Sequence, residues 1–161
     1  MTNLFQNIRD YYEGGDLHVR GLVDDCLPDN IKHVSGNLII HNCPNLKTLH
    51  IESVDGNVDI QECPSLESLG ELKTVGGFIL IWDCAKFACV GNKLSKVHNN
   101  LTINKCPKFS DLKGLKYVEG YCDFEDCPSL SNIDDMISIG HEIYIKGTNV
   151  KKSKFSNQFK L

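Results

Sequence analysis

Five cysteines recur along this chain at an almost constant interval. Cys43, Cys63, Cys84, Cys106 and Cys127 are separated by 20, 21, 22 and 21 residues, and each holds the same place in one local pattern. The pattern, Val-x-Gly-x-Leu-x-Ile-x-x-Cys-Pro-x-Leu-x-x-Leu, is nearly complete in residues 34–49 and 54–69. A fixed period of about 20–29 residues is typical of solenoids, in which each unit buries its apolar face only against its neighbours. The repeat therefore predicts a solenoid.

Two apolar residues alternate with polar ones just before each cysteine. A period of two indicates a strand with one buried face. Aligning the repeats gives seven such pairs: Leu17/Val19, Leu38/Ile40, Val58/Ile60, Ile79/Ile81, Leu101/Ile103, Cys122/Phe124 and Ile143/Ile145. Proline follows four of the five cysteines, and because it lacks a backbone N–H it marks where strand pairing ends. We therefore predict a β-rich, right-handed coil of about seven parallel strands, with return segments too short for full α-helices.

The two ends of the chain depart from the repeat. Residues 1–14 are predicted to form a helical cap, because apolar side chains share one helical face and two glycines follow. These apolar residues are Leu4, Phe5, Ile8, Tyr11 and Tyr12. Residues 15–150 are predicted to be a seven-coil solenoid. Residues 151–161 are basic, with two phenylalanines four residues apart, and are either an amphipathic cap over the last coil or a mobile tail.

The composition favours a single globular domain with no overall positive charge that could attract an anionic partner. The chain has 161 residues, of which 41% are hydrophobic, and a net charge of −4, so no overall field attracts nucleic acid or an anionic membrane. No run of residues is long and apolar enough to span a membrane, and the start has no apolar region typical of a signal peptide. We therefore expect a cytoplasmic protein whose eight cysteines are free thiols. Disulfide pairing within the cysteine column is the alternative.

Motifs for catalysis or metal binding are missing from the sequence. It has no phosphate-binding loop, no nucleophile elbow, no HExxH helix and no paired CxxC. A thiol enzyme would need an exposed, activated cysteine, whereas the column of cysteines is predicted to point inward. We expect no enzymatic activity, no metal and no cofactor.

The residues between the buried pairs are predicted to point outward and to form three columns across the stacked strands. The first column is Asp16, Asn37, Asn57, Phe78, Asn100, Tyr121 and Glu142; the second is His18, Ile39, Asp59, Leu80, Thr102, Asp123 and Tyr144; the third is Arg20, His41, Gln61, Trp82, Asn104, Glu125 and Lys146. Most are polar, as a hydrated face requires. The fourth strand is the exception, because it directs Phe78, Leu80 and Trp82 outward side by side.

This apolar strip predicts a site for another protein, because binding hot spots favour central tryptophan and tyrosine ringed by polar groups. Acidic neighbours suggest a partner with basic residues at its rim. The predicted binding residues are Phe78, Leu80, Trp82, Tyr121, Asp123, Glu125, Tyr144, Ile39 and Asp59. Three alternatives remain open: cover of the strip by the N-terminal helix or the tail, binding of a carbohydrate or small ligand, and a role in a structural assembly.

The strand motif, for example residues 101–112, resembles the leucine-rich repeat. The fuller units in residues 72–81 and 115–124 are similar to the repeat of receptor L domains, the ligand-binding lobes of insulin- and growth-factor-type receptors. They are also similar to short leucine-rich-repeat-like proteins of large tailed bacteriophages. The resemblance covers about residues 15–150 and implies the coil geometry. The phage resemblance further implies a possible use, which is to block a host protein in the host cytoplasm.

Overall fold

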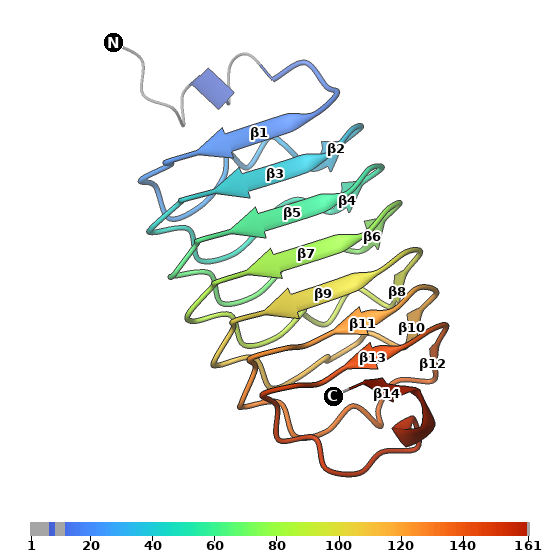
Figure 1. Cartoon of the computed structure of the whole chain (residues 1–161). Helices are drawn as coiled ribbons and strands as arrows, with labels where there is room; N and C mark the ends of the chain where they lie inside the picture. The colour runs from blue at the N-terminus through green and yellow to red at the C-terminus, as the bar shows by residue number, and fades with distance from the viewer. Residues whose placement is uncertain (1–6, 9–11, 161) are drawn as a thin grey trace.

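The main sheet of the molecule is a stack of parallel strands, one contributed by each repeat (Figure 1). In the computed structural model, which describes residues 7–8 and 12–160, its order follows the chain: β1 (Leu17–Arg20), β3 (Leu38–His41), β5 (Val58–Gln61), β7 (Ile79–Trp82), β9 (Leu101–Asn104), β11 (Cys122–Asp123), β13 (Ile143–Tyr144) and β14 (Phe159–Lys160). The first seven are the seven predicted strands, paired in the predicted register. The parallel β-solenoid is thus confirmed. The coil makes about six turns, one fewer than predicted.

Shorter strands line the return side of the coil. Three form one sheet, β2 (His33–Val34), β4 (Ser53–Val54) and β6 (Thr74–Val75), and three form another, β8 (Lys96–Val97), β10 (Tyr117–Val118) and β12 (Ser138–Ile139). The valine that opens each repeat is buried here and stacks on the valine or isoleucine of the next turn. The return segments contain no α-helix within residues 12–160, as their length predicts.

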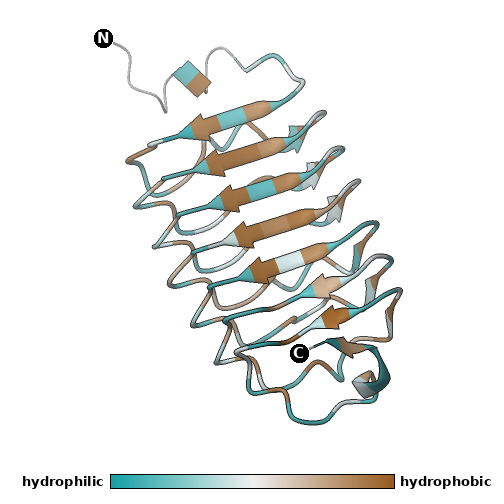
Figure 2. Cartoon of the chain, viewed as in Figure 1, coloured by the Kyte–Doolittle hydropathy of each residue, from teal (hydrophilic) through white to brown (hydrophobic). Residues whose placement is uncertain are grey.

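Hydrophobic residues recur along the strands of the main sheet (Figure 2), and the buried side chains of the coil form one continuous core. Side chains at alternate strand positions are buried and those between them are at least partly exposed. Phe87, Phe109 and Phe124 stack inside consecutive turns, with ring centroids 5.8 Å apart at each step. The five repeating cysteines are fully buried at the corners where the strands end.

Each corner depends on one residue with left-handed backbone. The residue before every repeating cysteine has a positive φ; these residues are Asn42, Glu62, Asp83, Lys105 and Asp126, with φ between 53° and 56°. This turn lets each thiol point inward, where it donates to the carbonyl oxygen two residues earlier at 3.3–3.7 Å. At the seventh corner Gly147 adopts the same region, with φ of 75°.

The N-terminal end shows less than the sequence predicts. The helical cap over residues 1–14 is not seen as an element: residues 1–6 and 9–11 lie outside the described part, and of the described residues in this range only Asn7 and Ile8 have helical backbone. Ile8 nonetheless joins the core, and its carbonyl oxygen accepts the Tyr12 N–H at 3.1 Å.

The C-terminal segment packs against the last turn. It forms a short 3₁₀-helix η1 (Ser156–Gln158) and then β14, which pairs in parallel with β13. Phe155 is buried in the core cluster and Phe159 packs against it. The edge of β13 is thereby covered within the chain.

Candidate binding face

A ladder of side-chain amides lies at the start of the strands. The Oδ1 atom of Asn37 accepts the backbone N–H of Asn57 at 2.9 Å, and Asn57 Oδ1 accepts the N–H of Phe78 at 3.0 Å. Asp16 and Asn100 do the same for Asn37 and Tyr121. The ladder fixes each strand against the previous turn, at the entrance to the outward face.

Phe78 interrupts this ladder. Its N–H donates to Asn57 Oδ1, but its side chain offers no acceptor to the next turn. The N–H of Asn100 instead donates to Asn99 Oδ1 at 2.9 Å. A phenyl ring here gives up one inter-turn hydrogen bond that asparagine supplies elsewhere. The ring therefore has no evident role in holding the turns together.

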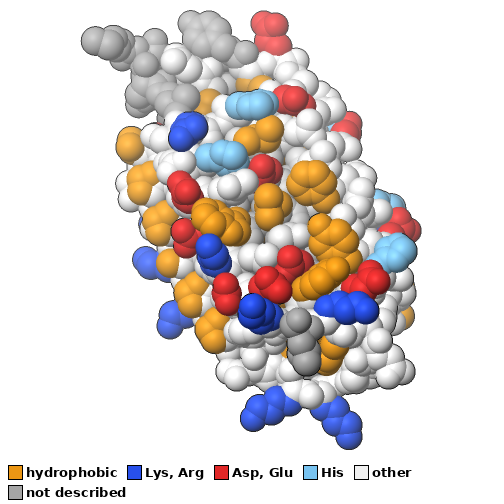
Figure 3. All heavy atoms as spheres, viewed as in Figure 1, with side chains coloured by type: hydrophobic (Ala, Val, Ile, Leu, Met, Phe, Trp, Pro, Cys, Tyr) orange, Lys and Arg blue, Asp and Glu red, His pale blue; other side chains and the backbone are white. Residues whose placement is uncertain are grey.

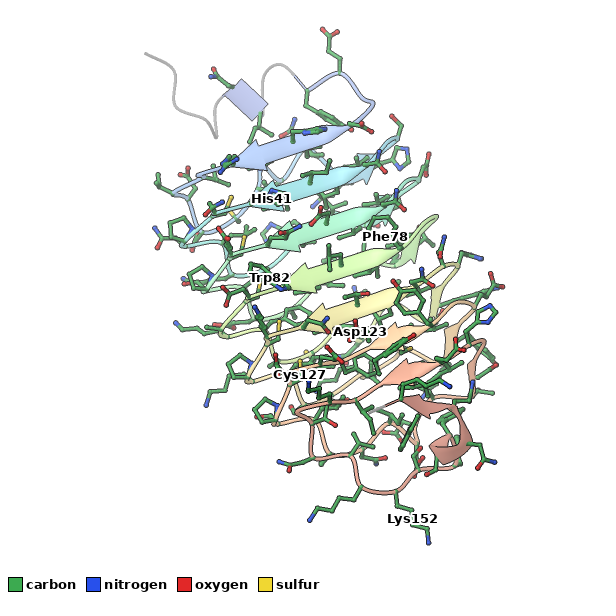
Figure 4. All side chains as sticks on the ribbon, in the orientation of Figure 1. His41, Phe78, Trp82, Asp123, Cys127 and Lys152 are labelled. Carbon is green, nitrogen blue, oxygen red and sulfur yellow. The ribbon has the colours of Figure 1, made fainter. Side chains whose placement is uncertain are left out.

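Strand β7 carries the apolar strip, consisting of Phe78, Leu80 and Trp82. All three side chains are half-buried by their neighbours on the sheet, and no described segment crosses in front of them (Figure 1). Phe78 and Trp82 lie at opposite ends of β7 (Figure 4). The Lys105 ammonium sits 4.7 Å from the centre of the Trp82 ring, so one aromatic face already contacts a cation. Among the described residues, the alternative that a terminal segment covers the strip is therefore not supported.

Two adjoining hollows lie beside the strip. The first, of about 400 Å³, is lined by Phe78, Leu80, Asn100, Thr102, Tyr121 and Asp123. The second, of about 420 Å³, is lined by Tyr121, Asp123, Glu125 and Tyr144. Tyr121 and Asp123 border both hollows, so the two lie side by side across β7 to β13. The surface view shows apolar side chains gathered over the middle of the sheet, with acidic ones beside them (Figure 3).

Tyr121 and Tyr144 form one wall of the second hollow. Tyr121 and Tyr144 are 36% and 37% exposed, although both rings are large and apolar. Their centroids are 6.0 Å apart and their planes meet at 85°, an edge-to-face arrangement. The edge of one ring therefore points toward the face of the other.

Asp123 and Glu125 form no ion pair with any residue that the structure describes. Asp123 accepts hydrogen bonds from Asn104 Nδ2 at 3.0 Å and from the Glu125 N–H at 3.2 Å. Along the return side, by contrast, carboxylates pair with lysines one turn away; these pairs are Asp25–Lys47, Glu52–Lys73, Glu71–Lys93 and Glu119–Lys96. The hydrogen bond and charge of Lys73, for example, lower the pKa of Glu52. The sheet face thus leaves two carboxylates without the cations that the return side supplies.

Ile39 and Asp59 do not line either hollow. Ile39 borders a separate depression of about 250 Å³ with His18, Arg20 and His41. Asp59 stands opposite Leu80 in the sheet register, but its Oδ1 accepts from Gln61 Nε2 at 2.8 Å and lies 3.3 Å from His41 Nε2. His41 Nε2 is buried and has no hydrogen-bond partner among the described residues.

The structure therefore brings together Phe78, Leu80, Tyr121, Asp123, Glu125 and Tyr144, and places Trp82 at the far end of its strand. Sequence reasoning did not single out Asn100, Thr102 and Lys105. Asn100 and Thr102 stand in the predicted outward columns, which was a usable signal. Lys105 was hidden because it precedes a corner cysteine.

The cysteines are unsuited to surface chemistry. All eight are free thiols, and six of them are buried. The adjacent Cys63 thiol and burial raise the pKa of Cys43, and burial raises the pKa of Cys122. A hydrogen bond from the Cys106 thiol lowers the pKa of Cys84 and Cys127, but burial blocks access to both thiols. In the described part of the chain, no three side chains of the types that bind metals come together, and no helix is long and apolar enough to cross a membrane.

Comparison with protein-family models, with curated proteins and with solved structures found no match to this chain. The likeness to leucine-rich repeats therefore rests on the repeat motif alone.

Proposed function

We propose that this chain is a protein-binding solenoid, not an enzyme, and that it recognises another protein through the outward face of its main sheet. One observation carries the proposal: β7 directs Phe78, Leu80 and Trp82 outward, whereas the strands beside it offer mainly polar side chains there. Together with the resemblance to leucine-rich repeats, this favours a recognition module working in a cytoplasm. In its most specific form, suggested by the phage resemblance, the partner is a host protein that a viral chain blocks.

The layout agrees with what is known of binding hot spots. Such sites concentrate their free energy in a few aromatic and apolar side chains near the centre of the contact, surrounded by polar groups that exclude water. Here the strip is near the middle of the stack, and polar residues of β3, β5 and β9 surround it. The broken amide ladder at Phe78 supports the same conclusion, since the ring is retained at the expense of a hydrogen bond.

The experiment begins with affinity capture from a lysate of candidate host cells and purification of the captured protein. Calorimetry then gives the Kd of the complex between the captured protein and the unaltered chain, and of its complexes with the Phe78→Ala and Trp82→Ala variants. We expect each substitution to weaken binding more than tenfold, since truncating a central aromatic residue typically costs about 2 kcal/mol. Ile137→Ala is the matched control, because Ile137 is 58% exposed away from the main sheet.

Equal affinity for all variants would show that the sheet face is not the binding surface. A glycan panel tests the alternative of carbohydrate binding: a sugar that binds in a Trp82-dependent manner, with no protein captured, would replace the proposal. Stable self-association through the same residues would instead indicate an assembly component.

A further inference from the structure

We infer that the second hollow receives a lysine or arginine side chain of the partner, next to an apolar side chain seated in the first hollow. The two side chains would belong to one extended segment, at positions i and i+2. The inference rests on the proposed function and names the chemistry that the partner must present.

The walls of the second hollow suit an organic cation. Tyr121 and Tyr144 both line it, and a cation held near an aromatic ring face is attracted by the negative charge density above it. Asp123 and Glu125 line the same space and supply formal negative charge. Aromatic faces combined with carboxylates recognise lysine and arginine better than they recognise a neutral apolar group.

The charge balance of the molecule points the same way. Within residues 12–160, four carboxylates of the return side pair with lysines one turn away, whereas Asp123 and Glu125 form no ion pair. The Lys105 ammonium lies over Trp82, and Lys146 forms no ion pair with a described residue. Two half-buried carboxylates without a cation are complementary to a positively charged group from outside.

The distance between the two hollows matches the distance between alternate side chains of an extended peptide segment. The first hollow is lined from β7 to β11 and is centred on β9, whereas the second lies between β11 and β13. Their centres are therefore one and a half strand spacings apart, or about 7 Å. Alternate side chains on one face of an extended chain are also about 7 Å apart. A segment crossing the strands can thus seat an apolar and a basic side chain separated by one residue.

Synthetic peptides test this directly, using NMR of the labelled, unaltered chain. The two probes are acetyl-Gly-Ser-Phe-Ser-Lys-Ser-Gly-amide and its counterpart with Phe and Lys exchanged, because the direction of the segment is open. A peptide with Phe and Lys adjacent has the same composition but sends the two side chains to opposite faces. A fourth peptide replaces lysine with the neutral norleucine.

We expect one spaced peptide to shift resonances of β7 to β13. Glu125→Gln or Asp123→Asn should then weaken its binding at least about fivefold, as should norleucine or the adjacent arrangement. Glu71→Gln is the matched control, since this carboxylate pairs with Lys93 on the return side, and it should change nothing.

Three results would overturn the inference: norleucine binding as tightly as lysine, lysine binding that ignores both carboxylate substitutions, or no binding by any spaced peptide. None of them decides the proposed function, which is judged separately by the Trp82 dependence of the purified partner. A face that binds its partner but not the cation would disprove only the cation site.

Discussion

At the scale of single residues, the glycine before β7 lies so close to a side-chain amide of the previous turn that no larger residue fits there. A Cβ atom on Gly77 would stand 2.0 Å from Asn57 Oδ1, the atom that accepts the Phe78 N–H. Gly77→Ala must therefore displace that amide and break an inter-turn hydrogen bond. We expect a loss of about 1–3 kcal/mol in the free energy of unfolding, measured by urea denaturation.

A double-mutant cycle separates this contact from a general effect of alanine. In an Asn57→Ala background the obstructing amide is gone, so Gly77→Ala should cost clearly less. The same cost in both backgrounds would mean that the amide ladder does not explain the glycine.

The buried thiols make a second prediction at this scale. A thiol reagent applied to the native chain should modify Cys26 and Cys89, which are partly exposed, well before Cys43, Cys63, Cys84, Cys106, Cys122 and Cys127. Burial both blocks access and disfavours the thiolate. Peptide mapping by mass spectrometry gives the order of labelling, and denaturation should make all eight react together. Rapid native labelling of the corner cysteines would contradict their assigned burial.

At the scale of one element, the inward side chains of β7 stabilise the fold, whereas its outward side chains belong to the proposed binding face. Ile81 is fully buried, so Ile81→Ala should destabilise the chain by about 2–5 kcal/mol through the cavity it opens. Trp82 is the outward neighbour and is only half-buried, so Trp82→Ala opens no enclosed cavity and should cost clearly less than Ile81→Ala. Thermal melts of the two variants provide the comparison. If both variants are destabilised equally, the strip belongs to the fold and not to a binding face.

The elements also show how far the sequence alone could reach. Period-two alternation located all seven strands, because each repeat buries the same pair of positions. It could not locate β14, since Phe155 and Phe159 are spaced as on a helix and only pairing with β13 makes that segment extended. The outward columns placed the apolar strip correctly. The hollows depend instead on how rings from different turns pack, as with Tyr121 and Tyr144, and no single repeat encodes that.

At the scale of the whole molecule, stability depends on how the ends of the stack are closed. Removal of residues 151–161 would uncover the edge of β13 and leave the last turn without Phe155. We expect a lower melting temperature and concentration-dependent association, because an open edge strand recruits other chains. Calorimetry and size-exclusion chromatography measure the two effects.

The control removes charge but keeps the apolar contacts. Lys151 and Lys152 are exposed in this segment, and Figure 4 shows the Lys152 side chain pointing away from the last turn. Replacing both with alanine should therefore leave the melt unchanged. A truncated chain that melts and elutes like the intact one would show that the segment is dispensable.

The left-handed corners offer positions at which substitution should increase the stability of the fold. Asn42 is of a residue type that tolerates positive φ, but Glu62 and Lys105 occupy the same conformation at a cost of about 1 kcal/mol each relative to a more tolerant residue. Because each turn contacts only its neighbours, asparagine at such corners should give gains that add from turn to turn. The thermal tolerance of the chain could then be adjusted in small steps along its length, without altering what the opposite end of each strand presents to a partner.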